Sequence, residues 1–197
     1  INRIHNFANH PFKVVDDEEM DELVESIEKN GILVPVLVRP DVDNTYEMIA
    51  GHRRMHAAIK IGLKTIPAIV RDLDDDEAII VMVDSNIQRK KLLPSEKAFA
   101  YKMKLEAMKH RVGRKSKENV SQFGTHYRAD SEMANELGES RNTIRRFIRL
   151  TELIPELLEY VDKKRLPFTS GVDISYLDKE IQKWIFEYIK ENGPVKS

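Results

Sequence analysis

Two adjacent arginines follow a glycine and a histidine where an apolar stretch gives way to a helical pattern. The stretch MIAGHRRMHAAIKIG covers Met48–Gly62, and the arginines are Arg53 and Arg54. A helix N-terminus offers unpaired backbone N–H groups and the positive end of the helix dipole, so it attracts an anion. Gly51 allows a ligand close to the backbone, and guanidinium forks bind phosphate oxygens. The pattern indicates a phosphate site, with an ordinary solvated arginine pair as the alternative.

A second polar cluster, VDSNIQRKK, occupies Val83–Lys91. On a helix, Asn86 shares a face with Arg89, three residues on, and with Lys90, four residues on. An amide oxygen beside cations suits a polyphosphate that carries Mg²⁺, because Mg²⁺ takes a few oxygen ligands together with phosphate. Taken alone, the cluster is more typical of a polar helix end. Together with the turn at Gly51, it indicates a polyphosphate site more specifically.

The segment SEMANELGESRNTIRRFIRLTEL has the pattern of a helix-turn-helix. Gly138 stands at the expected tight turn, a second helix begins near Arg141, and small or apolar residues recur where the two helices would pack. The first residues of such a second helix meet base edges, whereas later arginines contact phosphates. A basic helical hairpin that packs on another domain is the alternative. The expected DNA-contacting residues are Ser140, Arg141, Asn142, Thr143 and Arg145, with Arg146 and Arg149 as phosphate contacts.

The charge distribution supports a polyanionic partner for this segment. The chain has 197 residues and a formal net charge of −1. Residues 93–150 carry 13 Lys and Arg against 7 Asp and Glu, a net charge of +6, whereas residues 1–92 carry 12 against 17, a net charge of −5. A basic segment between acidic neighbours indicates nucleic-acid binding. The chain has no cysteine, which excludes disulfides, thiolate metal sites and a cysteine nucleophile.

The pattern of the chain changes at Pro94. Before it, helices and strands alternate, which predicts a small sheet with helices around it; after it, helical periodicity dominates. The predicted class is therefore α+β. We expect strands within residues 32–40, 41–51 and 65–73, and helices over 20–30, 53–61 and the stretch after the acidic run at 72–77. Beyond Pro94 we expect a long helix over 94–111, a loop with a short helix inside it over 112–130, the helix-turn-helix, and a tail helix over 178–193.

Four blocks of the sequence, in order and at similar spacing, resemble the ParB-like partition protein family (ParB/RepB-type nucleoid and plasmid partition proteins, with mobile-element variants). The blocks are GILVPVLVRP, YEMIAGHRRMHAA, IPAIVRDL and SNIQRKKLLPSEKAFAY, and the resemblance covers roughly residues 10–165. It implies a ParB/sulfiredoxin-like α/β domain with a small mixed sheet, followed by an all-α helix-turn-helix domain. It also implies that the first domain binds CTP with Mg²⁺.

The resemblance assigns ligand contacts residue by residue. His52 and Ser85 stand where the family has glutamates, so binding of CTP is expected more than its hydrolysis. A slow CTPase activity stays open, and no catalytic residue is assigned. The family's early proline-containing block is reduced to NHPFKV, in which Lys13 offers a cation. Asn86 is the expected metal-proximal residue. The expected nucleotide contacts are Lys13, Gly51, His52, Arg53, Arg54, Asn86, Gln88 and Arg89.

Together these expectations describe a sequence-specific DNA-binding partition protein that acts as a CTP-gated clamp. It is expected to be a cytoplasmic, nucleoid-associated homodimer on an inverted-repeat duplex, serving a chromosome, plasmid or mobile element, with a ParA-type ATPase as a further partner and no membrane. The expected domains are residues 1–93 (nucleotide), 94–165 (helix-turn-helix) and 166–197 (a helical segment, without the family's dimerisation domain). Two alternatives stay open: a nucleotide-dependent small-molecule kinase or phosphotransferase, and a helix-turn-helix transcription regulator without a ligand.

Overall fold

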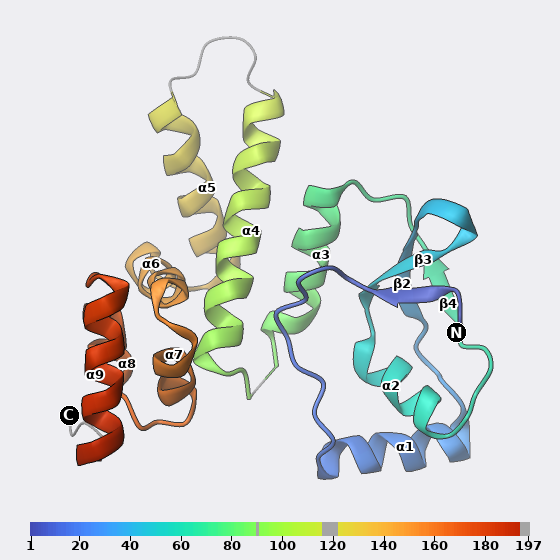
Figure 1. The fold of residues 1–197 in the computed structure, drawn as a ribbon. Helices are drawn as coiled ribbons and strands as arrows, with labels where there is room; N and C mark the ends of the chain where they lie inside the picture. The colour runs from blue at the N-terminus through green and yellow to red at the C-terminus, as the bar shows by residue number, and fades with distance from the viewer. Residues whose placement is uncertain (90, 116–121, 194–197) are drawn as a thin grey trace. The chain divides into compact units, whose positions relative to one another are not determined.

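The chain folds as two compact units, Ile1–Gln88 and Arg89–Ser197 (Figure 1). The structure is a computed structural model. It describes the backbone of residues 1–89, 91–115 and 122–193, and the side chains of these residues except those within 112–128. Within these ranges, no helix is both long and apolar enough to cross a bilayer.

The first unit is built on a four-stranded mixed sheet in the order β1-β3-β2-β4. Strands β2 (Val36–Pro40) and β3 (Tyr46–Ala50) are antiparallel and joined through the short 3₁₀ turn η1 (Val42–Asn44). Strand β1 (Ile4–Asn6) pairs in parallel with β3, and β4 (Ala68–Val70) pairs in parallel with β2. Parallel neighbours need crossover connections, and helices provide them here.

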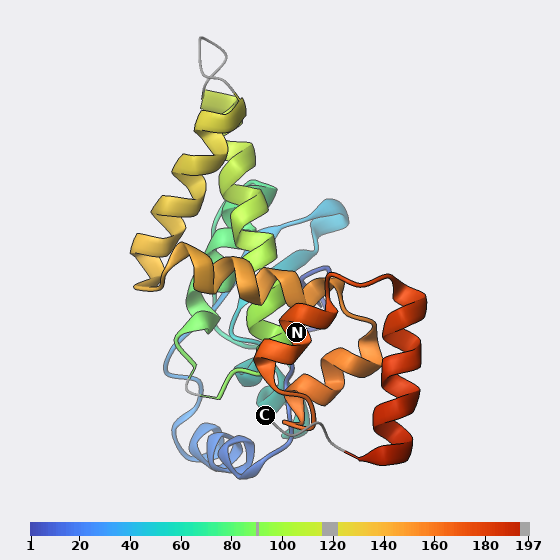
Figure 2. The same ribbon diagram turned by 90° about the vertical axis from the view of Figure 1, so that its left-hand side faces the viewer.

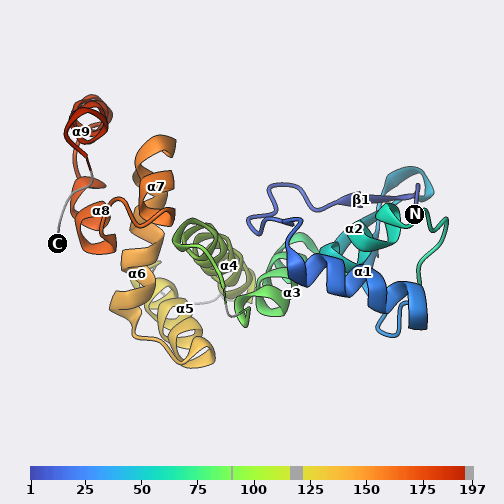
Figure 3. The ribbon, with the colours of Figure 1, turned by 90° about the horizontal axis from the view of Figure 1, so that it is seen from below.

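One face of the sheet is covered by α2 (His52–Lys60), and α1 (Glu18–Asn30) packs against α2 (Figure 3). Asp17 caps α1 by accepting a hydrogen bond from the backbone N–H of Met20 at 2.9 Å. Ala57 of α2 is fully buried in the core that α2 shares with α1. The core between the sheet and α2 consists of Val36, Val38, Met48 and Met55.

The helix α3 (Asp75–Ile87) packs against β3. Asp74 begins it with a capping box, in which its carboxylate accepts from the backbone N–H of Glu77 at 2.9 Å and the carboxylate of Glu77 accepts from the backbone N–H of Asp74. The acidic run therefore serves the N-terminus of this helix, where negative charge complements the helix dipole.

The second unit is helical and begins with the antiparallel pair α4 (Pro94–Lys115) and α5 (Gln122–Leu137) (Figures 1 and 2). The short helix α6 (Arg141–Arg149) follows and packs on both of them. Lys104 of α4 is buried, and its Nζ lies 2.7 Å from a carboxylate oxygen of Glu136 of α5. This ion pair satisfies a charge that would otherwise be very costly to bury.

The remaining elements are η2 (Leu150–Glu152), α7 (Pro155–Asp162), α8 (Phe168–Ile174) and α9 (Lys179–Asn192). One core joins residues of α4, η2, α7, α8 and α9. Gln182 of α9 is fully buried, and its side-chain oxygen accepts from the backbone N–H before α7 at 2.8 Å. The described part of residues 166–197 thus packs into the second unit; a domain boundary at residue 165 stays a prediction.

The predicted class and the small mixed sheet are confirmed, but some boundaries are wrong. The strand expected over residues 32–40 begins only at Val36, because Pro35 has no backbone N–H for a sheet ladder. The short β1 was not predicted. The segment 112–130, expected as a loop with a short helix inside, is helical up to Lys115 and from Gln122 onwards, and residues 116–121 lie outside the described residues. Ala129 of α5 is fully buried, so the packing of this helix outweighs the weak helix propensity of the residues near it.

Candidate nucleotide and nucleic-acid sites

The turn before α2 is built around Gly51, whose φ of 107° is a left-handed value that side-chain-bearing residues rarely adopt. A Cβ at this position would lie 2.7 Å from Cγ1 of Val36 on β2. Glycine is therefore required here by the backbone conformation and by packing on the sheet, independently of any ligand.

Both arginines of the turn have partners inside the first unit. The Arg53 Nη2 lies 3.3 Å from Oδ1 of Asp17 and 3.9 Å from a carboxylate oxygen of Glu19, at the start of α1. The Arg54 Nη1 donates to the carbonyl of Pro35 at 2.6 Å, and burial lowers the pKa of its guanidinium. Two cations in a first turn predicted an external anion, but α1 already supplies carboxylates to one of them.

His52 is buried at the start of α2, with its ring centroid 3.8 Å from that of His10. A pocket of about 350 Å³ opens beside the two rings, between α2 and the segment that precedes α1. Its lining includes Phe12 and His56 and neither arginine of the turn. Such a wall of rings suits a flat, partly apolar group better than a phosphate. Lys13, expected as a cation, is exposed in the same segment.

Asn86 is buried near the end of α3, and its amide nitrogen donates to the carbonyl of Met82 at 2.8 Å and lies 3.1 Å from Oγ of Ser85. Both contacts are made by the amide nitrogen, so a ligand of Asn86 would have to bind its amide oxygen. Gln88 caps α3 and ends the first unit, whereas Arg89 opens the second. The expected place of Arg89 beside the turn therefore stays a prediction.

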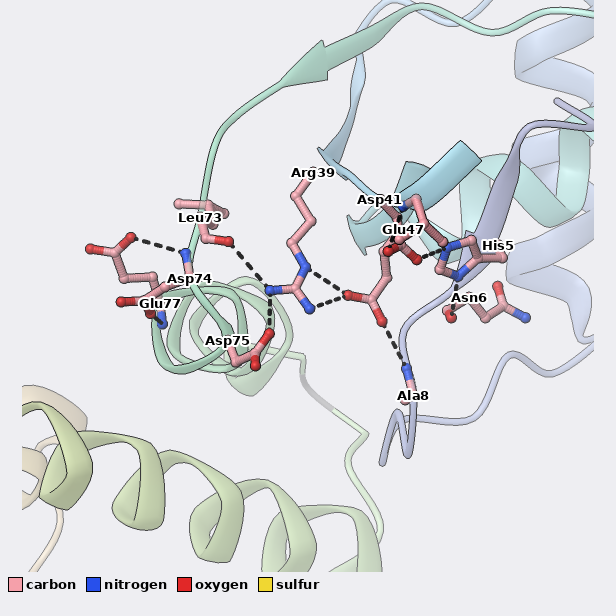
Figure 4. Close-up of polar contacts among 11 residues, drawn as sticks. His5, Asn6, Ala8, Arg39, Asp41, Glu47, Leu73, Asp74, Asp75 and Glu77 are labelled. Atoms are coloured by element: carbon pink, nitrogen blue, oxygen red, sulfur yellow. Dashed lines mark hydrogen bonds and ion pairs between the residues drawn. The ribbon is translucent and has the colours of Figure 1, made fainter. Parts of the chain in front are cut away.

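An ion-pair network around Arg39 escaped the sequence analysis (Figure 4). Arg39 and Glu47 face each other across β2 and β3, and the guanidinium lies 2.6 and 2.7 Å from one oxygen of Glu47. It also reaches Asp75 at the start of α3 at 2.7 Å, and the other oxygen of Glu47 accepts from the backbone N–H of Ala8 at 3.2 Å. Burial acts to lower the pKa of Arg39, but these hydrogen bonds raise it.

The network ties α3 and the segment after β1 to the sheet. These two elements carry expected ligand contacts, Asn86 on α3 and Lys13 further along the segment. The sequence analysis expected strands on both sides of this turn but no pairing between them; the antiparallel register places Arg39 opposite Glu47, where opposite charges stabilise each other.

The turn of the helix-turn-helix follows the prediction closely. Gly138 has a φ of 64°, and open space surrounds the position that a Cβ would take. The hydroxyl of Ser140 caps α6 by accepting from the backbone N–H of Thr143 at 3.0 Å, and the two hydroxyl oxygens lie 2.8 Å apart. Both expected DNA contacts therefore also hold the first turn of the helix in place.

The arginines of α6 fall into two environments. Arg141 and Arg145 are exposed, as is Asn142. Arg149 is half-buried: its Nη2 donates to the carbonyl of Ser175 at 2.6 Å. Its guanidinium also stacks on the ring of Tyr176 at 4.1 Å, and that of Arg146 lies 5.3 Å from the ring of Phe168. Arg146 and Arg149 are only partly exposed, because α8 and the residues that follow it pack against them; their predicted contact with phosphates stays a prediction.

The aspartate that meets Arg145 was also missed. Asp130 of α5 accepts from the guanidinium of Arg145 at 2.6 Å. Asp130 was expected at the end of a loop segment with a short helix inside, which gave no reason to put the residue beside α6.

Each of the two units matches a family of known proteins. Residues 1–87 match the family described as ParB N-terminal domain, and residues 117–195 match that described as ParB HTH domain. The chromosome-partitioning protein Spo0J of Thermus thermophilus is 34% identical over 183 residues, which are 93% of this chain and 61% of that protein. The nucleoid occlusion protein of Listeria innocua is 31% identical over 183 residues, which are 92% of this chain and 58% of that protein. The chain thus spans about three fifths of the length of these relatives.

A solved structure supports the same assignment. The C-terminally truncated chromosome-partitioning protein ParB from Caulobacter crescentus, complexed to the centromeric parS site, matches with a TM-score of 0.54 and 27% identity, over 95% of this chain and 89% of that one. With a ParB N-terminal domain followed by a ParB HTH domain, the chain belongs to the ParB-like family of partition proteins.

Proposed function

We propose that this chain is a sequence-specific binder of double-stranded DNA of the partition type, and that its first unit is a CTP-binding switch. The observation that carries the proposal is the start of α6, where a capped helix presents Arg141, Asn142 and Arg145 to solvent. Residues at this end of a recognition helix meet base edges in the major groove. The relative from Caulobacter crescentus was solved on the parS site, so parS is the first duplex to test.

The DNA part is tested by fluorescence anisotropy with a labelled parS duplex and a scrambled duplex of the same composition. We expect tighter binding to parS, because base contacts add to a phosphate term that both duplexes share. The double substitution Arg141→Ala and Asn142→Ala removes two exposed contacts and is expected to reduce the difference. Equal affinity of the unmodified chain for both duplexes contradicts a parS-specific function.

Three features of the first unit support CTP as its ligand. The first turn of α2 has no side-chain cap, so its backbone N–H groups suit phosphate oxygens. The pocket beside His10 and His52 offers rings against which a base can stack. The resemblance of the GHRR and SNIQR blocks to the family's nucleotide motifs names CTP. Bound CTP would supply a triphosphate whose contacts favour one arrangement of the protein over another.

Mg²⁺ fits only as a partner of the phosphates. Among the described residues, no group of three or more His, Cys, Asp or Glu side chains could hold a metal ion. Asn86 would contribute one amide oxygen, and the triphosphate would supply others, in keeping with the preference of Mg²⁺ for few protein ligands. The proposed nucleotide contacts are Lys13, Gly51, His52, Arg53, Arg54, Asn86, Gln88 and Arg89.

Binding without turnover is the proposed role of CTP. Ser85, which stands where the family has a glutamate, donates its hydroxyl to the carbonyl of Met82 at 2.9 Å, and His52 is buried against His10. Neither offers a carboxylate to act as a general base, which also weakens the kinase alternative. Phosphate release from CTP at the rate of the buffer blank is expected; steady release, with or without a small acceptor, contradicts this part.

The wider role follows from the family. A homodimer on an inverted repeat would place one α6 on each half-site, and CTP would close the first units around DNA during segregation of a chromosome, plasmid or mobile element. A ParA-type ATPase is the proposed partner at the nucleoid. The observation that favours a second candidate, a ligand-independent regulator, is that Arg53 and Arg54 already bond within the chain. If the chain is such a regulator, addition of CTP does not change how long it stays bound to DNA.

A further inference from the structure

One arginine of α6 is held in a fixed orientation by the preceding helix. The Nε and Nη2 of Arg145 lie 3.2 and 2.6 Å from the same oxygen, Oδ2 of Asp130 on α5. The Arg145 side chain is 63% exposed, whereas that of Asp130 is 12% exposed. A nearly buried carboxylate thus anchors one edge of a guanidinium whose other edge lies in solvent.

The geometry divides the donors of Arg145 into two sets. A guanidinium has five N–H donors in a planar fork, and Asp130 takes one from Nε and one from Nη2. The second hydrogen of Nη2 and one hydrogen of Nη1 remain on the terminal edge, and the other hydrogen of Nη1 points back towards Cδ. No other side chain or carbonyl in the described part of the chain accepts from Arg145. The terminal edge is therefore a pair of parallel donors on a side chain that has already lost much of its rotamer freedom.

Two parallel donors discriminate among the bases of the major groove. Guanine presents two acceptors there, O6 and N7, which match the fork. Adenine presents one acceptor and one N–H donor, and cytosine presents a donor, so each opposes part of a fixed fork. A free arginine can turn away from a mismatched base towards a phosphate, but one held by Asp130 cannot do so without breaking the ion pair.

We propose that Arg145 reads a guanine in the target duplex and that Asp130 is the positioning residue that makes this contact selective. The inference rests on the proposed DNA-binding function. It adds which base is recognised, and that Asp130 positions the arginine that recognises it. Asp130 also subtracts one positive charge from the surface that meets DNA. Its presence therefore lowers affinity for any duplex while it raises selectivity for one base.

The competing account is that Asp130 and Arg145 only join α5 to α6. In that account the loss of the pair alters stability, and any loss of DNA binding is spread evenly over all positions of the site. The two accounts differ in one measurable quantity, the dependence of affinity on the base at a single position.

The experiment is a selection from a library of randomised duplexes with the full chain, followed by anisotropy on single-base-pair variants of the selected site. The unmodified chain is expected to select a site with a guanine whose replacement by adenine lowers affinity roughly 10- to 100-fold. Arg145→Lys keeps the charge but lacks the fork, and is expected to lose the preference at that position alone. Asp130→Asn is expected to weaken the same preference while affinity for unrelated duplexes stays equal or rises.

The matched control is Glu132→Gln, which removes the same charge from an exposed position of α5, two residues from Asp130. It is expected to leave every base preference unchanged. All variants are compared at equal helical content by circular dichroism. A guanine preference that survives both Arg145→Lys and Asp130→Asn, or losses spread evenly over the site, overturns the inference and leaves DNA binding intact. Selection of no motif by the unmodified chain overturns the proposed function as well.

Discussion

The starts of α2 and α6 look alike in sequence and differ in the folded chain. Both follow a glycine turn, both carry arginines within the first five residues, and neither has an acidic residue in its first turn. At α2 the arginines meet carboxylates of α1 and a carbonyl beside β2. At α6, Arg141 is exposed, and Arg145 keeps one edge of its guanidinium in solvent.

The difference shows what an arginine pattern can and cannot establish. A cation in the first turn of a helix is unfavourable unless an anion compensates it, but the anion can belong to the protein or to a ligand. At α2 the protein itself supplies the anion, because Asp17, the N-cap of α1, lies 36 residues before Arg53 in the chain and contacts it. At α6, Asp130 bonds one edge of Arg145 and the other edge lies in solvent, so a polyanion suits this helix start.

The largest expected effect separates the two glycine turns. Gly51→Ala should destabilise the first unit by about 4 kcal/mol, because it combines a strained φ with a Cβ that overlaps Val36. Gly138→Ala meets no atom within 4 Å and should cost only about 1 kcal/mol, from backbone strain alone.

Urea unfolding measures both changes. Hydrogen exchange in urea, followed by mass spectrometry of peptides from β2 and β3 and of peptides from α4 and α7, reports the two units separately. Gly51→Ala should lower the midpoint of the first set of peptides and leave that of the second set unchanged. Similar costs for the two glycines would mean that the turn at Gly51 relaxes freely and that its packing on β2 is unimportant.

Substitution of Arg39 tests whether the arginines of the first unit that hydrogen-bond within the chain stabilise its fold. Arg39→Ala should lower the free energy of unfolding by about 3 kcal/mol, because it leaves the buried Glu47 carboxylate without its counter-charge. Asp75→Asn removes an exposed partner of the same guanidinium and should cost well under 1 kcal/mol. Hydrogen exchange of β2 and β3 peptides measures the effect, and equal protection in both variants would argue against a buried ion pair.

The smallest effects compare two arginines within α6. Arg149→Ala should destabilise the second unit by about 1 kcal/mol, since it removes the bond to Ser175 and the contact with Tyr176. Arg141→Ala should leave stability unchanged and weaken binding to duplex DNA roughly fivefold. Hydrogen exchange of α4 and α7 peptides in urea measures the stability, and anisotropy with DNA measures the binding. The reverse pattern would mean that the two environments of α6 are wrongly assigned.

Local sequence patterns predicted most of the helices, strands and turns. The helix of residues 20–30, the strand ending at Pro40, the glycine turns and the helix-turn-helix all carry short-range signals such as caps, alternation and helical spacing. Side-chain partners from distant segments carry no such signal: Asp17 beside Arg53, His10 on His52, and Asp130 beside Arg145 depend on how helices pack. The start of α5 was missed for the same reason, since its helix is stabilised by contacts with α4.

The most direct test of the account asks whether Arg53 serves a nucleotide as well as Asp17. Calorimetric titration of CTP with Mg²⁺, with ATP, GTP and UTP as comparators, should show selective binding of CTP. Arg53→Ala should weaken it roughly 10- to 100-fold, the cost of a charge-assisted hydrogen bond. Asp17→Asn preserves the cap of α1 but releases Arg53, so it should strengthen CTP binding. Absence of nucleotide binding in the unmodified chain, with parS binding intact, would contradict the switch and leave a DNA-binding protein whose α2 arginines are purely structural.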